Sequence, residues 1–309
     1  MPIQLHIGDC IDSMRTMPAQ SVQTCITSPP YFGLRDYGHE GQIGLEATPD
    51  AFVEKLVEVF REVRRVLRDD GTLWLNLGDS YNAYNGGAGP SSSLSRGAQT
   101  TERPQLATGY GLKFKGLKPK DLIGIPWRVA FALQADGWYL RQDIIWHKPN
   151  PMPESTKDRC TKAHEYLFLL SKSERYYFDS EAMQEPATGR DPGNKTHKYA
   201  TQYEVEEGEQ HRTKAGLTAV GARQTRNRRS VWTVATRPYK GAHFATFPPD
   251  LIEPCVLAGA PAGGVVLDPF GGSGTTAQVA LKHDRRAVLC ELNPAYEPLI
   301  WERLSGGFA

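Results

Sequence analysis

Residues 264–276 read GVVLDPFGGSGTT, an apolar run followed by a turn rich in glycine. The run 264–268 predicts a buried strand, and the glycines after it let the backbone turn into a helix over 275–283. A second strand over 287–291 and a helix over 294–304 follow. Short strands that alternate with helices are typical of a doubly wound, mostly parallel α/β sheet.

The rest of the chain supplies further elements of the same kind, which hydrophobic periodicity identifies. Asp50 is expected to cap a helix, and Asp70-Gly71 is expected to form a turn before a strand. The expected elements are strands over 3–7, 22–27, 72–77, 139–146 and 165–171, and helices over 50–68, 121–136 and 249–258.

Two long segments interrupt this pattern. Residues 82–117 are rich in Gly, Ser, Asn and Thr, which predicts a mobile loop. Residues 181–242 show weak periodicity, and their part from 211 to 240 holds basic residues but no Asp or Glu. Both segments are therefore interpreted as insertions into the α/β sheet.

Composition limits the classes of protein and of site. The formal net charge is +1 over 309 residues, so nucleic-acid binding would depend on local basic clusters. Five scattered cysteines without a CxxC pair predict neither a disulfide framework nor a zinc site, and no other metal-ligand spacing is apparent. The chain shows no signal-peptide pattern and no run of about 18 apolar residues. A soluble, cytoplasmic protein without a membrane span is therefore expected.

The glycine turn carries the first functional signal. Its glycines allow a ligand to approach the backbone, and free N–H groups at the helix start would face that ligand. Asp268 before the turn favours an amine-bearing ligand over a phosphate, and Glu291 ends the next strand where an acid commonly holds ribose hydroxyls. The turn lacks a phosphate-binding lysine and does not match GxGxxG. The alternative is a tight turn without a ligand.

The second signal is Ser28-Pro29-Pro30-Tyr31, at the end of the strand over 22–27. Two consecutive prolines fix the backbone, so that a hydroxyl and a carbonyl can point at one amino group. Tyr31 offers a flat face on which a base can stack. The alternative is a stiff turn with a packed tyrosine.

Together, TSPPY at 27–31 and VLDPFGGSGTT at 266–276 resemble the catalytic motif and the S-adenosylmethionine loop of the DNA amino-methyltransferases, which act on cytosine N4 or adenine N6. The catalytic motif precedes the cofactor loop, as in the beta class of that family. The resemblance implies a circularly permuted Rossmann-like methyltransferase fold with an inserted target-recognition region.

The same resemblance divides the chain into functional segments. It implies a catalytic half over 1–81 and 118–180, a target-recognition region over 181–242, and a cofactor-binding half over 243–309. The loop insertion 82–117 matches no motif of the family.

Site residues follow position by position from the resemblance. Asp9 is expected near the cofactor adenine, and Phe247 in a segment that closes over the cofactor. Trp146, Lys148 and Pro149 resemble a segment near the extruded base. The implied catalytic residues are Ser28, Pro29, Pro30 and Tyr31; the cofactor-binding residues are Asp9, Cys10, Phe247, Asp268, Pro269, Phe270, Gly272, Gly274, Thr275 and Glu291; and the DNA-binding residues are Arg223, Arg226, Arg228 and Arg229.

The implied reaction moves a methyl group from S-adenosylmethionine to the N4 amino group of cytosine in double-stranded DNA, with the base flipped out. Ser before Pro-Pro usually goes with cytosine in this family, whereas Asp or Asn goes with adenine; adenine N6 is therefore the alternative. Expected partners are double-stranded DNA, a cognate restriction endonuclease and a second copy of the chain.

Other functions conflict with particular features. Methylation of RNA or of protein glutamine is disfavoured by the motif order and the basic insertion. A DNA-binding module without catalysis is opposed by the two intact motifs, and a nicotinamide-linked oxidoreductase by the glycine pattern. A nucleophilic role for Cys255 is disfavoured because this residue precedes the cofactor loop on a predicted helix.

Overall fold

Eight strands of the described chain form one sheet, in a computed structural model that describes residues 2–34, 36–82, 116–187, 225–236 and 247–305. Their order is β1-β10-β9-β2-β3-β5-β4-β8, and β5 alone runs antiparallel to its neighbours. The prediction of a mostly parallel sheet is confirmed. The bounds are β1 Ile3–Ile7, β2 Val22–Thr27, β3 Leu67–Leu77, β4 Tyr139–His147, β5 His164–Ser171, β8 Val231–Thr233, β9 Val265–Asp268 and β10 Arg286–Glu291.

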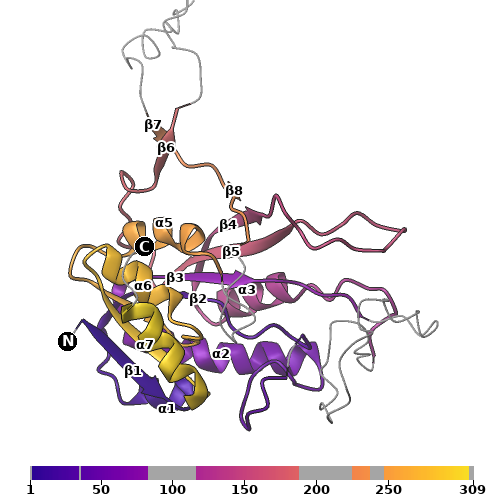
Figure 1. Cartoon of the computed structure of the whole chain (residues 1–309), viewed down its shortest axis with the longest axis horizontal. Helices are drawn as coiled ribbons and strands as arrows, with labels where there is room; N and C mark the ends of the chain where they lie inside the picture. Colours follow the sequence, from indigo (N-terminus) through magenta and orange to yellow (C-terminus); the bar gives the residue numbers. More distant parts are fainter. Residues whose placement is uncertain (1, 35, 83–115, 188–224, 237–246, 306–309) are drawn as a thin grey trace, which may run out of the picture.

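Helices cover both faces of this sheet, as a doubly wound fold requires (Figure 1). Phe52 and Phe60 of α2 are completely buried in one core cluster, whereas Leu251 and Ile252 of α5 are completely buried in the other. The first face carries α1 Cys10–Arg15, α2 Pro49–Val66 and α3 Ile125–Ala135; the second carries α5 Pro249–Gly259, α6 Thr275–Lys282, the short 3-10 helix Pro294–Tyr296 and α7 Glu297–Ser305.

The pairing of β2 with β9 joins the two ends of the chain. Thr24 pairs with Val266 and Cys25 with Leu267, in parallel register. The loops after two parallel neighbours leave the sheet at the same edge, where ligands bind in open α/β sheets. The segment Ser28–Tyr31, here called the serine–proline corner, and the glycine turn after β9 therefore emerge side by side.

Three local expectations were wrong at the ends of elements. Thr48, rather than Asp50, caps α2, because its hydroxyl accepts a hydrogen bond from the Ala51 N–H at 3.1 Å. Asp70-Gly71 forms no turn: β3 runs through it, and an irregularity in the pairing with β2 absorbs the extra residues. Helix α3 begins at Ile125 and not at 121, because Gly124 before it is left-handed, with φ 79°.

The insertions are described only in part. The expected mobile loop lies outside the described residues except at its ends, where the Asn82 side chain donates to the carbonyls of Leu117 and Lys118. Within 181–242, strands β6 Gln184–Pro186 and β7 Thr225–Asn227 form a separate ribbon (Figure 1). Periodicity predicted neither this ribbon nor β8, which adds a parallel edge to the main sheet beside β4.

Candidate active site

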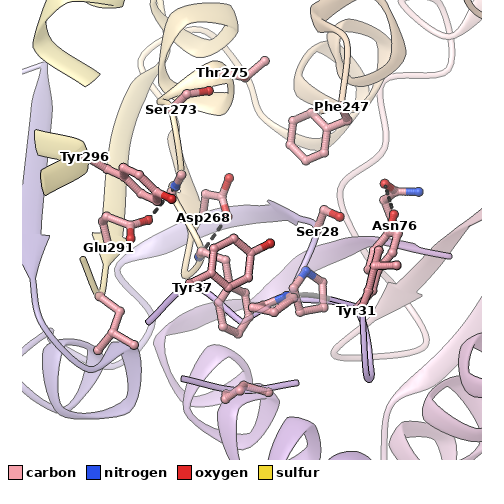
Figure 2. A pocket seen from close by; sticks show the side chains of 18 of the residues that line it. Ser28, Tyr31, Tyr37, Asn76, Phe247, Asp268, Ser273, Thr275, Glu291 and Tyr296 are labelled. Carbon is pink, nitrogen blue, oxygen red and sulfur yellow. Dashed lines mark hydrogen bonds between the residues drawn. The ribbon is translucent and has the colours of Figure 1, made fainter. Parts of the chain in front are cut away.

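A cavity of about 900 Å³ opens at the carboxyl ends of the parallel strands. Both sequence motifs line it. Figure 2 shows Glu291 and Tyr296 on one side of the cavity and Ser28 and Tyr31 on the other, with Asp268 between them. The expected juxtaposition of the two motifs is therefore present in the fold. Other predicted residues on the wall are Asp9, Cys10, Pro29, Pro30, Trp146, Lys148, Phe247, Pro269, Phe270, Gly272 and Thr275.

Asp268 connects the two motifs directly. Its side chain is buried, and its two oxygens accept hydrogen bonds from the hydroxyls of Thr27 and Thr276, each at 2.6 Å. The Phe270 N–H donates to it as well, at 3.1 Å. Burial raises the pKa of this carboxyl, although the three donors oppose that rise. Asp268 thus holds the glycine turn against the end of β2, and its binding of a ligand amine stays a prediction.

The glycine turn has a left-handed backbone at two positions, a conformation that glycine adopts more readily than other residues. Gly272 and Gly274 have φ values of 53° and 81°. A Cβ on Gly274 would also lie 3.2 Å from the Ile300 side chain, so α6 begins close against α7. Thr275, the first residue of α6, is buried and accepts a hydrogen bond from Arg303. The start of α6 is therefore fixed against the wall of the cavity.

Glu291 organises the other side of the turn. One oxygen accepts from the Gly272 N–H at 2.8 Å, and the other accepts from the Asn293 N–H at 2.9 Å. Its backbone carbonyl receives the Gly8 N–H at 2.8 Å, so the end of β1 lies against the end of β10. Burial raises the pKa of Glu291. A carboxylate on the cavity wall in this place can still accept hydrogen bonds from ligand hydroxyls.

Asp9 and Cys10 lie at the start of α1, on the same part of the wall. Asp9 caps the helix, because one of its oxygens accepts from the N–H groups of Ile11 at 2.8 Å and Asp12 at 3.0 Å. Its other oxygen is free of these contacts and could accept from a ligand amino group. Burial raises the pKa of Cys10 to about 12, so its thiol is neutral near pH 7.

Ser273 has a side chain whose hydroxyl fits a bound S-adenosylmethionine at this end of the cavity. Its hydroxyl is buried and lacks a hydrogen-bond partner within the described chain. A buried hydroxyl without a partner is costly unless a ligand or water satisfies it. Together with Glu291 and the aromatic ring of Tyr296, it offers the polar and apolar contacts that an adenosyl ligand with an amino-acid tail requires.

Tyr31 at the opposite end is fixed by its hydroxyl. This hydroxyl donates to Glu165 at 2.6 Å and lies 3.2 Å from the Asn76 side-chain oxygen. The ring also lies close over Gly78: a Cβ added there would be 2.5 Å from the ring. Burial and the neighbouring Glu165 raise the pKa of Tyr31 well above its usual range, so the phenol stays protonated.

Glu165, Asn76 and Lys148 complete this end of the cavity. Lys148 donates to Glu165, and its ammonium group lies 4.3 Å from the ring centre of Trp146. Asn76 donates to Glu165 at 3.3 Å and to the Tyr166 carbonyl at 3.1 Å. Sequence reasoning missed Glu165 and Asn76, because each lies within a strand and outside either motif. Glu165 pairs across strands with Trp146, a register that the sequence alone does not specify, so no sequence signal marked it.

Three of the four predicted DNA-binding arginines are described, and these three do not line the cavity. Arg223 lies outside the described residues. Arg226 and Arg229 both donate to Glu185 of β6, at 2.9 and 2.8 Å. Arg228 lies 5.3 Å from the ring centre of Trp232. This basic cluster belongs to the β6–β7 ribbon and the segment between that ribbon and β8.

Cysteine and metal chemistry have no structural support in the described chain. Cys255 is completely buried in α5 and does not line the cavity, and burial raises its pKa. All five cysteines are free. Across residues 2–34, 36–82, 116–187, 225–236 and 247–305, no group of three or more His, Cys, Asp or Glu is placed to hold a metal ion. None of the helices described there is long and apolar enough to cross a membrane.

A permuted Rossmann-like sheet that brings the Ser28–Tyr31 segment and the glycine turn into one cavity is the arrangement of a methyltransferase. Comparison with known proteins identifies the family: the model for DNA methylases with N6 or N4 specificity matches residues 22–302, and the chain belongs to that family. It is 48% identical to the type II methyltransferase M.XycI of Xanthomonas campestris pv. cyanopsidis, over 98% of this chain and 87% of that protein. It is 46% identical to M.SmaI of Serratia marcescens, over 97% and 90%.

Solved structures agree on the fold. The PvuII DNA methyltransferase, which is specific for cytosine N4, matches with a TM-score of 0.64 and 18% identity, over 97% of this chain and 86% of that chain. A DNA modification methylase of Thermus thermophilus, complexed with S-adenosyl-L-methionine, matches with a TM-score of 0.58 and 25% identity, over 98% and 96%. The chain is thus a DNA methylase by family, and a neighbour that shares its fold was solved with S-adenosyl-L-methionine bound.

The raised pKa of Glu291 predicts how cofactor affinity depends on pH. The ionised carboxylate accepts ribose hydroxyls best, so affinity should be full above its pKa and fall as pH drops through it. Because burial raises that pKa, the fall should begin above the ordinary value of about 4.3. Calorimetric titration with S-adenosylmethionine at several pH values measures this. The Glu291→Gln variant should bind more weakly and lose this pH dependence; an unchanged pH profile would contradict the role.

Proposed function

We propose that this protein methylates the N4 amino group of cytosine within a specific sequence of double-stranded DNA. The serine–proline corner supports this proposal most directly. Ser28 begins the corner and lines the cavity that the glycine turn also lines. Serine in that position goes with cytosine in most members of the family that the chain resembles. The alternative, adenine N6, would use the same cavity.

The chemical problem is the poor nucleophilicity of the exocyclic amine, whose lone pair is delocalised into the ring. S-adenosylmethionine supplies an electrophilic methyl group on a sulfonium centre. The Ser28 hydroxyl and the Pro29 carbonyl would each accept a hydrogen bond from the amine. Two fixed acceptors favour a pyramidal nitrogen, and they stabilise positive charge that develops there in the transition state. The rigid prolines keep both acceptors in place before the base arrives.

Tyr31 would hold the extruded base beside these acceptors. A base inside a duplex cannot reach the floor of the cavity, so the enzyme must flip it out. The fixed phenol hydroxyl and the contact with Gly78 keep the Tyr31 ring in one orientation. Lys148 lies at the same end of the cavity and can donate to a ring acceptor of the base. These side chains form the proposed base pocket.

Base-resolved mapping tests the proposal most directly. Genomic DNA lacking methylation is incubated with the protein and S-adenosylmethionine carrying a labelled methyl group, and the modified nucleoside is identified after digestion. N4-methylcytosine within one recurring sequence is the expected product. N6-methyladenine as the main product would overturn the proposed target base and leave the methyltransferase assignment intact. The mapped sequence also defines the substrate for the experiments below.

The basic cluster of the β6–β7 ribbon is proposed to contact DNA phosphates. Replacing Arg226, Arg228 and Arg229 together by Gln should weaken DNA binding and flatten its salt dependence. Each lost phosphate contact should lower the slope of log K against log salt by about 0.9. Fluorescence anisotropy across a salt series measures the slope. Arg61→Gln is a matched control, because Arg61, like Arg229, is exposed and paired with an acid, here Asp136. Equal slopes in the triple variant and the wild type would contradict the assignment.

Two proposed partners go with a type II enzyme. A restriction endonuclease that cleaves the same sequence would need this methyl mark to spare the host DNA. A homodimer is proposed from the resemblance to the beta class. Mixing the mapped, methylated duplex with candidate endonucleases tests the first, and light scattering of the purified protein tests the second.

A further inference from the structure

The most exposed large apolar side chain in the described chain stands on the wall of the active-site cavity. Met152 is 86% exposed, and it lines the same cavity as Ser28 and Tyr31. Single exposed apolar side chains are common on protein surfaces, so exposure alone does not indicate a function. The position is informative, because a base that reaches Tyr31 enters the cavity that Met152 also lines.

Met152 lies in the loop that connects β4 to β5, which extends beyond the sheet (Figure 1). Prolines flank it on both sides, at Pro151 and Pro153. Each proline fixes its own φ and restricts the residue before it. The backbone at Met152 is therefore held in an extended form, with the thioether side chain exposed rather than folded onto the loop.

The same loop is braced on both sides of this methionine. On one side, Asn150 exchanges two hydrogen bonds with the backbone of Thr236, at 3.2 and 3.1 Å. On the other side, Glu154 forms an ion pair with Arg159 and accepts from the Lys162 N–H at 3.3 Å. The loop is thus ordered up to the residues next to Met152, while this side chain itself has open space.

We propose that Met152 inserts into the DNA stack and fills the gap left when the target base is extruded. This inference rests on the proposed base flipping. Base extrusion leaves a void between the neighbouring base pairs, and methionine is among the apolar side chains that proteins insert between base steps. An unbranched thioether adapts its shape to such a gap. Two prolines and the braced loop limit the conformational freedom that insertion would cost.

The test compares a paired duplex with one in which the target base is already mismatched. On the paired duplex, Met152→Ala should lower turnover about tenfold to a hundredfold, because the gap is no longer filled. A mismatched base leaves the stack with little help, so on the mismatched duplex the turnover of the same variant should fall less than about threefold. Met152→Leu, which keeps an apolar side chain of similar volume, should stay near wild type on both duplexes.

A fluorescent cytosine analogue that pairs with guanine, such as pyrrolocytosine, at the target position reports extrusion by its fluorescence, and Met152→Ala should reduce that signal on the paired duplex. Phe131→Ala is the matched control, because Phe131 is 56% exposed on α3 and does not line the cavity. Equal losses on paired and mismatched duplexes, or no loss on either, would overturn the proposal. Methylation of adenine by the wild type would instead refute the proposed target base, and the variant-to-wild-type ratios would still decide the role of Met152.

Discussion

Asp268→Ala is expected to abolish cofactor binding and to destabilise the whole fold. The buried carboxylate accepts hydrogen bonds from Thr27, Thr276 and the Phe270 N–H. Removing it leaves the two buried hydroxyls without an acceptor, at a cost of about 1–3 kcal/mol for each, and the half-buried Phe270 N–H loses its acceptor as well. The loss would be a large part of the 5–15 kcal/mol, roughly, that stabilises a typical domain. The glycine turn would also lose its attachment to β2.

Denaturant unfolding and calorimetric titration with S-adenosylmethionine measure the two effects. Asp268→Asn separates shape from acceptor capacity, because it fills the same space and keeps one acceptor oxygen. It should cost about 1–2 kcal/mol of unfolding free energy and weaken the cofactor without abolishing its binding. If Asp268→Ala unfolds like the wild type and binds the cofactor normally, then the turn is held by other contacts.

The sequence predicted the fold at the places where local and global signals agree. The run 264–268 is short, apolar and followed by glycines, and it forms β9 in the middle of the sheet. Adjacency of β9 to β2 could be inferred only from the resemblance of the two motifs, since no periodicity specifies strand order. The hydrogen bond between Thr27 and Asp268 then follows from the parallel register of these strands.

The errors have identifiable physical causes. Asp-Gly is a strong turn signal, but at Asp70-Gly71 the same dipeptide fits an irregular part of a strand, where glycine allows close contact with the Arg68 carbonyl. Strand β8 has three residues, too few for a period of two to be read. Glu165 reaches the site because the antiparallel β5 is placed between β3 and β4, and Asn76 reaches it from β3, the neighbour of β2. That placement is a tertiary property.

Tyr31→Ala is expected to nearly abolish turnover while cofactor binding stays normal. Stacking of a base on an aromatic ring contributes roughly 1–3 kcal/mol, so its loss alone should lower turnover by about fivefold to 150-fold. The variant also leaves Glu165 without the phenol donor. Glu291 and Tyr296, which are predicted to contact the cofactor, lie on the other side of Asp268 from Tyr31 (Figure 2), so the affinity for S-adenosylmethionine should not change. Turnover on the mapped duplex and calorimetric titration of the cofactor measure both properties.

Two neighbouring variants separate the presence of the ring from its position. Tyr31→Phe keeps the ring and removes only the hydrogen bonds of the hydroxyl, so its turnover should fall severalfold. Gly78→Ala keeps Tyr31 intact, but its Cβ would lie 2.5 Å from the ring, closer than van der Waals contact allows. The ring must then move, and turnover should fall nearly as far as in Tyr31→Ala. Full activity of Gly78→Ala would show that the base does not depend on the orientation of this ring, and full activity of Tyr31→Ala would remove its stacking role.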